Sequence, residues 1–104
     1  MAPLTRVRIV GPSMEPALLN DEWWVVRRTS DVRPGDVVLL VHPLRPDLLV
    51  VKRIARRDGD GWWVEGDNAS VSDDSRQFGP VPGSSIVGRL WWRYKPLRRS
   101  GMGS

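Results

Sequence analysis

The chain has 104 residues, with 16 basic and 12 acidic side chains, one histidine (His42) and no cysteine. This length suits a single domain over residues 1–104, with a core over about 5–95. The lack of cysteine excludes thiol nucleophiles, disulfides and thiolate metal sites, and one histidine excludes a multi-histidine metal site. We therefore expect neither a metal nor another cofactor.

Charge and hydropathy narrow the function classes further. The net charge of +4 permits nucleic-acid binding without requiring it. The longest apolar run, residues 37–41, is far shorter than the about 20 residues of a membrane span. The N-terminus carries Arg6 and Arg8 and lacks a signal-peptide core. We expect a cytoplasmic protein without a transmembrane anchor.

The first two predicted strands enclose a turn. Residues 5–10 alternate apolar with basic or polar side chains, which predicts a half-buried strand. Residues 11–16, GPSMEP, hold a serine between two prolines, which cannot continue a helix or a central strand. We expect one helical turn at residues 17–19 and the next strand at residues 22–28.

The middle of the chain predicts two more strands. The sequence RPGD at residues 33–36 is a strong turn signal. The apolar, β-branched run at residues 37–41 predicts a short strand. A loop with two prolines, residues 42–47, then leads into the longest predicted strand, residues 48–57.

The last third contains a hairpin and a long loop. The sequence DGDG at residues 58–61 predicts a hairpin turn into a strand at residues 62–65. Residues 66–82 are rich in Gly, Asn, Ser, Asp and Pro and predict a long loop, which in a compact domain is usually functional. A strand at residues 86–94 precedes a basic tail, residues 96–104, that we expect to be frayed. The predicted fold is all-β, made of antiparallel strands.

The tryptophans come in adjacent pairs, at residues 23–24, 62–63 and 91–92. Neighbouring strand residues face opposite ways, so each pair presents one indole to each face. Outward indoles would suit a membrane interface or a protein substrate. We expect at least one indole of each pair to lie in the core.

Ser13 is the candidate nucleophile. A hydroxyl on a stiff, exposed turn can meet a substrate without first becoming ordered. A serine beside proline is more often an ordinary turn residue, so its assignment depends on a base to activate it.

Lys52 is the candidate base. In an extended strand it shares a face with Val50 and Ile54. If that face is buried, desolvation lowers the pKa of the lysine, and its neutral amine can take the serine proton. Val51 and Ala55 on the opposite face are also apolar, so the strand period leaves the choice of face open.

Several segments in order resemble the conserved boxes of signal peptidase I-like Ser/Lys peptidases. They are GPSMEP at 11–16, RPGDVV at 33–38, VKRI at 51–54, GDN through SDDSR at 66–76, and IVGR at 86–89. The resemblance spans roughly residues 8–89. The chain is most similar to the short, anchorless branch of nickel-type superoxide dismutase maturation proteases, which remove an N-terminal extension from the dismutase precursor.

The resemblance implies a small signal-peptidase-like or repressor-peptidase-like β domain, partly barrel-like, that acts as a serine endopeptidase on a protein precursor. Ser13 would be the nucleophile, and Lys52 the general base that later protonates the leaving amine. Ser72 would orient the lysine amine, while Asp74 and Arg76 would brace its loop.

The oxyanion and substrate sites also follow from the resemblance. The backbone N–H of Ser13 is the expected oxyanion donor. Bacterial signal peptidases often have a serine two residues before the nucleophile, where this chain has Gly11, so the second donor stays open. An extended peptide would pair with strand edges beside the site. The candidate wall residues, which ordinary core packing explains equally well, are Ile9, Val10, Met14, Val50 and Val51.

Two alternatives from other classes stay open. A non-catalytic relative would bind a peptide without cutting it. A basic β domain could bind single-stranded nucleic acid by stacking bases on tryptophan. The arginines are spread over several predicted elements and no nucleic-acid motif is present, so we expect no nucleic-acid partner. The oligomeric state is not predicted.

Overall fold

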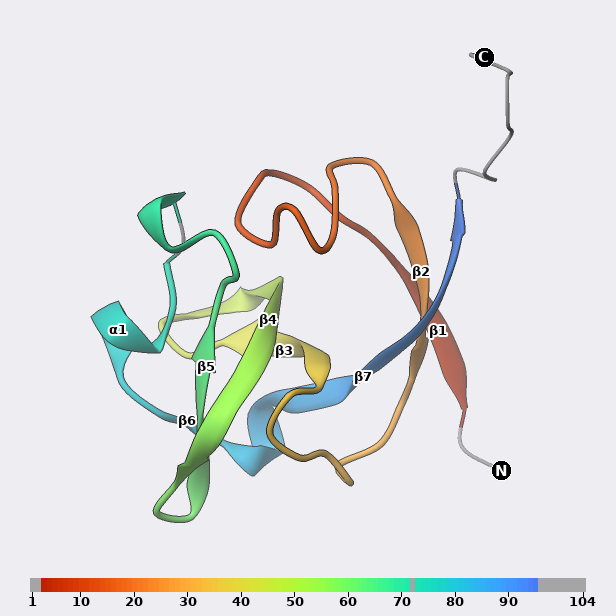
Figure 1. Ribbon diagram of the computed structural model, residues 1–104. Helices are drawn as coiled ribbons and strands as arrows, with labels where there is room; N and C mark the ends of the chain where they lie inside the picture. The colour runs from red at the N-terminus through yellow and green to blue at the C-terminus, as the bar shows by residue number, and fades with distance from the viewer. Residues whose placement is uncertain (1–2, 72, 96–104) are drawn as a thin grey trace.

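The computed structural model describes residues 3–71 and 73–95, which form one antiparallel sheet of seven strands (Figure 1). The strands are β1 (Leu4–Arg8), β2 (Trp23–Arg27), β3 (Val37–His42), β4 (Arg45–Asp58), β5 (Gly61–Glu65), β6 (Val81–Pro82) and β7 (Ile86–Lys95). Their order across the sheet is β1-β2-β7-β3-β4-β5-β6, so the sheet is open and β1 and β6 are its edges. The all-β prediction is confirmed, although the sheet does not close into a barrel.

The hairpin of β3 and β4 differs from the predicted boundaries. β4 begins at Arg45, so the loop predicted over residues 42–47 is wrong in its second half. At the end of β3 the register shifts, and residues 46–48 of β4 have no partner in the ladder. Such a bulge tolerates Pro46, because proline has no N–H to donate to a neighbouring strand.

The long loop predicted over residues 66–82 contains short elements. They are a 3-10 turn (Ala69–Val71), helix α1 (Ser75–Phe78) and strand β6. A capping box starts α1, because the Asp74 carboxylate accepts from the helix backbone while the side chain of Gln77 accepts from the Asp74 N–H. A second 3-10 turn (Gly83–Ser85) leads into β7. The tail at residues 96–104 lies outside the described residues.

The core consists of two apolar clusters on opposite faces of β3. The β5-side cluster contains Val32, Val38, Leu40, Ile54, Trp62, Val64, Val81 and Ile86. The β2-side cluster contains Ile9, Met14, Leu18, Val26, Leu39 and Leu90. Because both faces of β3 are covered, the strand is apolar from Val37 to Val41 instead of alternating. Burying one such Val, Leu, Ile or Met side chain contributes about 1.5–3 kcal/mol.

The tryptophan pairs divide unequally between core and surface. Trp62 lies in the β5-side cluster. Trp91 and Trp92 are 53% and 63% exposed, so the expectation that each pair buries an indole is wrong for this pair. The register shift between β2 and β7 explains it, because Leu90 and Trp92 pair with consecutive β2 residues and leave Trp91 in a bulge.

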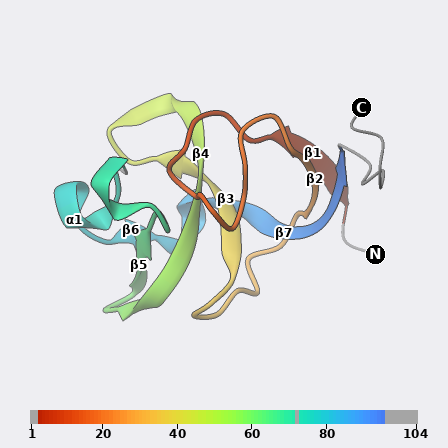
Figure 2. The same cartoon turned by 45° about the horizontal axis from the view of Figure 1, so that its top comes forward.

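The loop between β1 and β2 lies beside β4 in both views (Figures 1 and 2). Residues 9–22 make up this loop, which we call the Ser13 loop, and β4 carries Lys52. The fold therefore brings together the two segments from which the sequence predicted a nucleophile and a base.

Candidate active site

The Ser13 loop is closed at its base by backbone hydrogen bonds. The N–H of Ile9 donates to the carbonyl of Glu22 at 2.8 Å, and the N–H of Asp21 donates to the carbonyl of Ile9 at 2.7 Å. Next to the serine, Met14 is only 1% exposed and packs in the β2-side cluster. Ser13 therefore lies next to the buried Met14, in a loop whose two ends are hydrogen-bonded to each other.

A buried carboxylate braces the end of the same loop. Glu22 is 4% exposed and accepts hydrogen bonds from the Leu19 N–H, the Trp24 indole and the Arg93 guanidinium. Burial raises the pKa of Glu22, but these three donors outweigh burial and hold the pKa below its usual value. The charged form ties the loop to β7.

The helical turn predicted at residues 17–19 begins earlier than expected. The N–H of Leu18 donates to the carbonyl of Met14 at 2.9 Å, and the N–H of Glu15 donates to Pro12 at 3.0 Å. Residues 17–19 themselves do not form a helix. The turn lies here because the side chains of Met14 and Leu18 are both buried in the β2-side cluster.

Gly11 has a conformational role. Its φ is +88°, in the region that L side chains rarely adopt. Its N–H donates to the side-chain oxygen of Asn20 at 2.8 Å, across the loop. This backbone N–H is therefore engaged within the loop, and the positive φ gives a physical reason for glycine at this position.

Lys52 lies on the buried face of β4. Its side chain is 4% exposed, Ile54 on the same face is 1% exposed, and Lys52 is paired with Val38 of β3. Burial lowers the pKa of Lys52. The carboxylates of Asp74 and Asp73 act in the opposite direction without outweighing burial.

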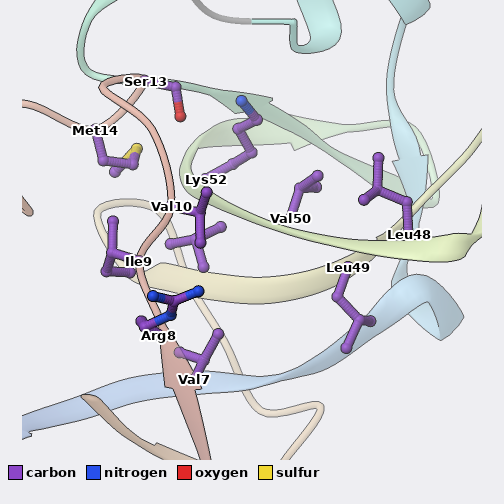
Figure 3. A pocket seen from close by; sticks show the side chains of 11 residues that line it. Val7, Arg8, Ile9, Val10, Ser13, Met14, Leu48, Leu49, Val50 and Lys52 are labelled. Carbon is purple, nitrogen blue, oxygen red and sulfur yellow. The ribbon is translucent and has the colours of Figure 1, made fainter. Parts of the chain in front are cut away.

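A cavity of about 420 Å³ lies between the Ser13 loop with β1 and the middle of β4. Ser13 and Lys52 both line it, and Figure 3 shows the Lys52 side chain extending from β4 toward the loop that carries the Ser13 hydroxyl. The five predicted wall residues line this cavity: Ile9, Val10, Met14, Val50 and Val51. Ile9 and Met14 also belong to the core, whereas Val10 is 72% exposed.

Asp74 and Arg76 lie together next to this region. Asp74 is fully buried and accepts hydrogen bonds from the Gly66 N–H at 2.8 Å, the Arg76 N–H at 3.0 Å and the Arg76 guanidinium. Burial raises the pKa of Asp74, but these donors hold it below its usual value. An ionised Asp74 thus holds α1 and the segment after β5 beside Lys52. Ser72, predicted to orient the lysine amine, lies outside the described residues.

Asn68 links the segment after β5 to the Ser13 loop. Its backbone N–H donates to the carbonyl of Ser13 at 2.8 Å, and its side-chain amide donates to the carbonyl of Pro12 at 3.1 Å. The preceding Asp67 forms a two-pronged ion pair with Arg53, the residue after Lys52 on β4. This connection joins the strand of the candidate base to the turn of the candidate nucleophile.

Comparison with known proteins identifies the family. Residues 2–90 match the family model described as Peptidase S24-like. The chain belongs to this family. The S24-like chain is 31% identical over 115 residues to mitochondrial inner membrane protease subunit 1 of Xenopus tropicalis, covering 88% of this chain and 69% of the relative.

Two further relatives of the S24-like chain carry similar names. Mitochondrial ATP-independent inner membrane protease subunit 1a of Arabidopsis thaliana is 32% identical over 120 residues, covering 89% of this chain and 71% of the relative. Mitochondrial inner membrane protease subunit 2 of Mus musculus is 33% identical over 102 residues, covering 71% of this chain and 57% of the relative. The protease-named relatives support a peptidase with protein substrates, while processing of a dismutase precursor stays a proposal.

Among residues 3–71 and 73–95, no group of three His, Cys, Asp or Glu side chains is arranged to hold a metal ion. No helix within that part of the chain is long and apolar enough to cross a membrane.

Proposed function

We propose that this S24-like peptidase is a serine endopeptidase in which Ser13 is the nucleophile and Lys52 the general base. The observation that carries the proposal is that Ser13 and the buried Lys52 line the same cavity, with the Lys52 side chain extending toward the Ser13 loop. Burial lowers the pKa of Lys52, which favours the neutral amine that the reaction needs.

The reaction begins when the Ser13 oxygen attacks the scissile carbonyl carbon and its proton passes to the Lys52 amine. The negative charge on the carbonyl oxygen is stabilised by the Ser13 backbone N–H. The Lys52 ammonium then gives its proton to the departing amine, which leaves an ester on Ser13. Water hydrolyses this ester with Lys52 again acting as base. Ser72, by resemblance to the family, orients the amine.

The substrate lies extended in the cavity between β1 and β4. β1 is an edge of the sheet, so a peptide can pair with its free side and direct alternate side chains into the cavity. The wall beside the reacting groups includes Val10, Val50 and Val51, which favours small apolar side chains near the cut. The substrate we propose is a precursor with a removable N-terminal extension, namely that of nickel superoxide dismutase, processed in the cytoplasm.

The test is incubation of the purified chain with such a precursor, followed by mass spectrometry of the new N-terminus. We expect one cut, lost in Ser13→Ala and in Lys52→Met. Ser84→Ala is the matched control, because Ser84 is exposed in the second 3-10 turn and does not line the cavity. Cleavage by folded Ser13→Ala would overturn the mechanism.

The same assay separates the alternatives. Cleavage of another precursor with the same dependence on Ser13 would keep the chemistry and replace the substrate. Binding of the precursor without cleavage would identify a non-catalytic relative. Salt-dependent binding of an oligonucleotide in place of any peptide would favour the nucleic-acid alternative.

A further inference from the structure

The chain's one histidine has no part in the proposed reaction and is nonetheless buried. His42 ends β3, is 4% exposed and does not line the cavity. Its ring packs edge-on against Phe78 of α1, with ring centroids 5.0 Å apart. A buried polar ring requires hydrogen-bond partners, and these partners connect His42 to the candidate site.

The hydrogen bonds of His42 define which ring nitrogen carries the proton. Nδ1 accepts from the backbone N–H of Leu44 at 3.1 Å. Nε2 therefore carries the hydrogen and donates it to the carboxylate of Asp73 at 3.0 Å. The neutral ring thus joins the end of the β3–β4 hairpin to the segment that leads into α1.

This connection ends next to the candidate base. Lys52 interacts electrostatically with the carboxylates of Asp74 and Asp73 and with the guanidinium of Arg76. Asp74 is held by Arg76 and the Gly66 N–H, whereas the Asp73 side chain is 61% exposed. Water can solvate the exposed Asp73 carboxylate without a protein partner, so the hydrogen bond from the buried His42 ring serves to hold this carboxylate in one position.

We propose that His42 is a positioning residue that holds the Asp73 carboxylate near the Lys52 amine. The inference rests on the proposed function, in which Lys52 is the base. A carboxylate near an ammonium favours the charged form. His42 therefore moves the onset of activity to higher pH than burial alone would set.

The test measures kcat/KM against pH for His42→Phe, Asp73→Asn and the conservative variant His42→Gln, on the peptide that the wild type cleaves. Phe keeps the packing on Phe78 but cannot donate to Asp73, whereas the Gln amide can. On the acid side of the profile we expect His42→Phe and Asp73→Asn to be roughly twofold faster than wild type, the size of a solvent-screened charge interaction. His42→Gln should keep the wild-type profile.

A purely structural histidine would give a different result. If folded His42→Phe keeps the wild-type pH profile, or is equally slower at every pH, the inference is overturned. An NMR titration of the 13C-labelled Lys52 side chain in the same variants requires no cleavage. If the wild type cuts no precursor but this titration moves to lower pH in His42→Phe, the proposed function fails while the electrostatic connection stands. An unmoved titration overturns the connection itself.

Discussion

The most informative single substitution is Asn68→Ala, which loosens the Ser13 loop without entering the cavity lining. The side-chain amide of Asn68 donates to the Pro12 carbonyl at 3.1 Å, while its backbone N–H bonds the Ser13 carbonyl at 2.8 Å. Alanine removes the first hydrogen bond and keeps the second. The loop therefore keeps its position and loses one hydrogen bond next to the nucleophile.

The expected size follows from the loss of one exposed hydrogen bond. A net contribution of about 0.5–1.5 kcal/mol corresponds to a fall in kcat of about 2- to 12-fold, because 1.4 kcal/mol is tenfold in rate. KM should change little, since the cavity walls are untouched. Asn68→Asp is nearly isosteric but cannot donate to Pro12, so it should be at least as slow as Asn68→Ala.

The assay is steady-state cleavage of the precursor peptide, with thermal denaturation measured in parallel. Asp60→Ala is the surface control, because Asp60 is exposed at the tip of the β4–β5 hairpin. Unchanged kcat in both Asn68 variants would refute the argument that this residue positions the nucleophile. A loss that appears entirely in KM would refute it equally.

Two predictions concern stability. A methyl group added at Gly88 would lie 2.4 Å from the carbonyl oxygen of Arg27. Gly88→Ala should therefore separate β2 from β7 and lower the free energy of unfolding, measured by urea denaturation, by about 1–3 kcal/mol. An unchanged denaturation midpoint would contradict this packing. Lys52→Met should stabilise the protein at neutral pH, because burial lowers the pKa of Lys52 and the folded state resists its protonation. As pH rises toward the ordinary lysine pKa, the unfolded chain also loses this proton, so the wild type becomes more stable and the difference narrows. If the stability difference between Lys52→Met and the wild type widens as the pH rises, the pKa of Lys52 is not lowered in the folded state.

The sequence predicted the strand order along the chain because local signals marked it. Alternation identified β1, and the DGDG turn identified the β4–β5 hairpin. The face of Lys52 was not predictable by the same reasoning. Both faces of β3 and β4 contact apolar clusters, so Val51 on one side and Ile54 on the other are equally apolar.

The contacts that brace the site escaped sequence reasoning for a different reason. Asn68 and Pro12 are 56 residues apart, and His42 and Asp73 are 31 apart, so no local pattern relates them. The resemblance includes the GDN segment but gives Asn68 no role. The capping box of α1 was a readable local signal, since Asp74 precedes Gln77 by three residues.

Titration of Lys52 by NMR tests the central claim most directly. The chain has only two lysines, Lys52 and Lys95, so 13C-lysine labelling gives two side-chain signals that Lys95→Arg assigns. The account predicts that Lys52 loses its proton below the ordinary lysine pKa, and that kcat/KM for the precursor rises over the same pH range. A Lys52 midpoint at or above the ordinary value would contradict the assignment of this amine as the base for Ser13.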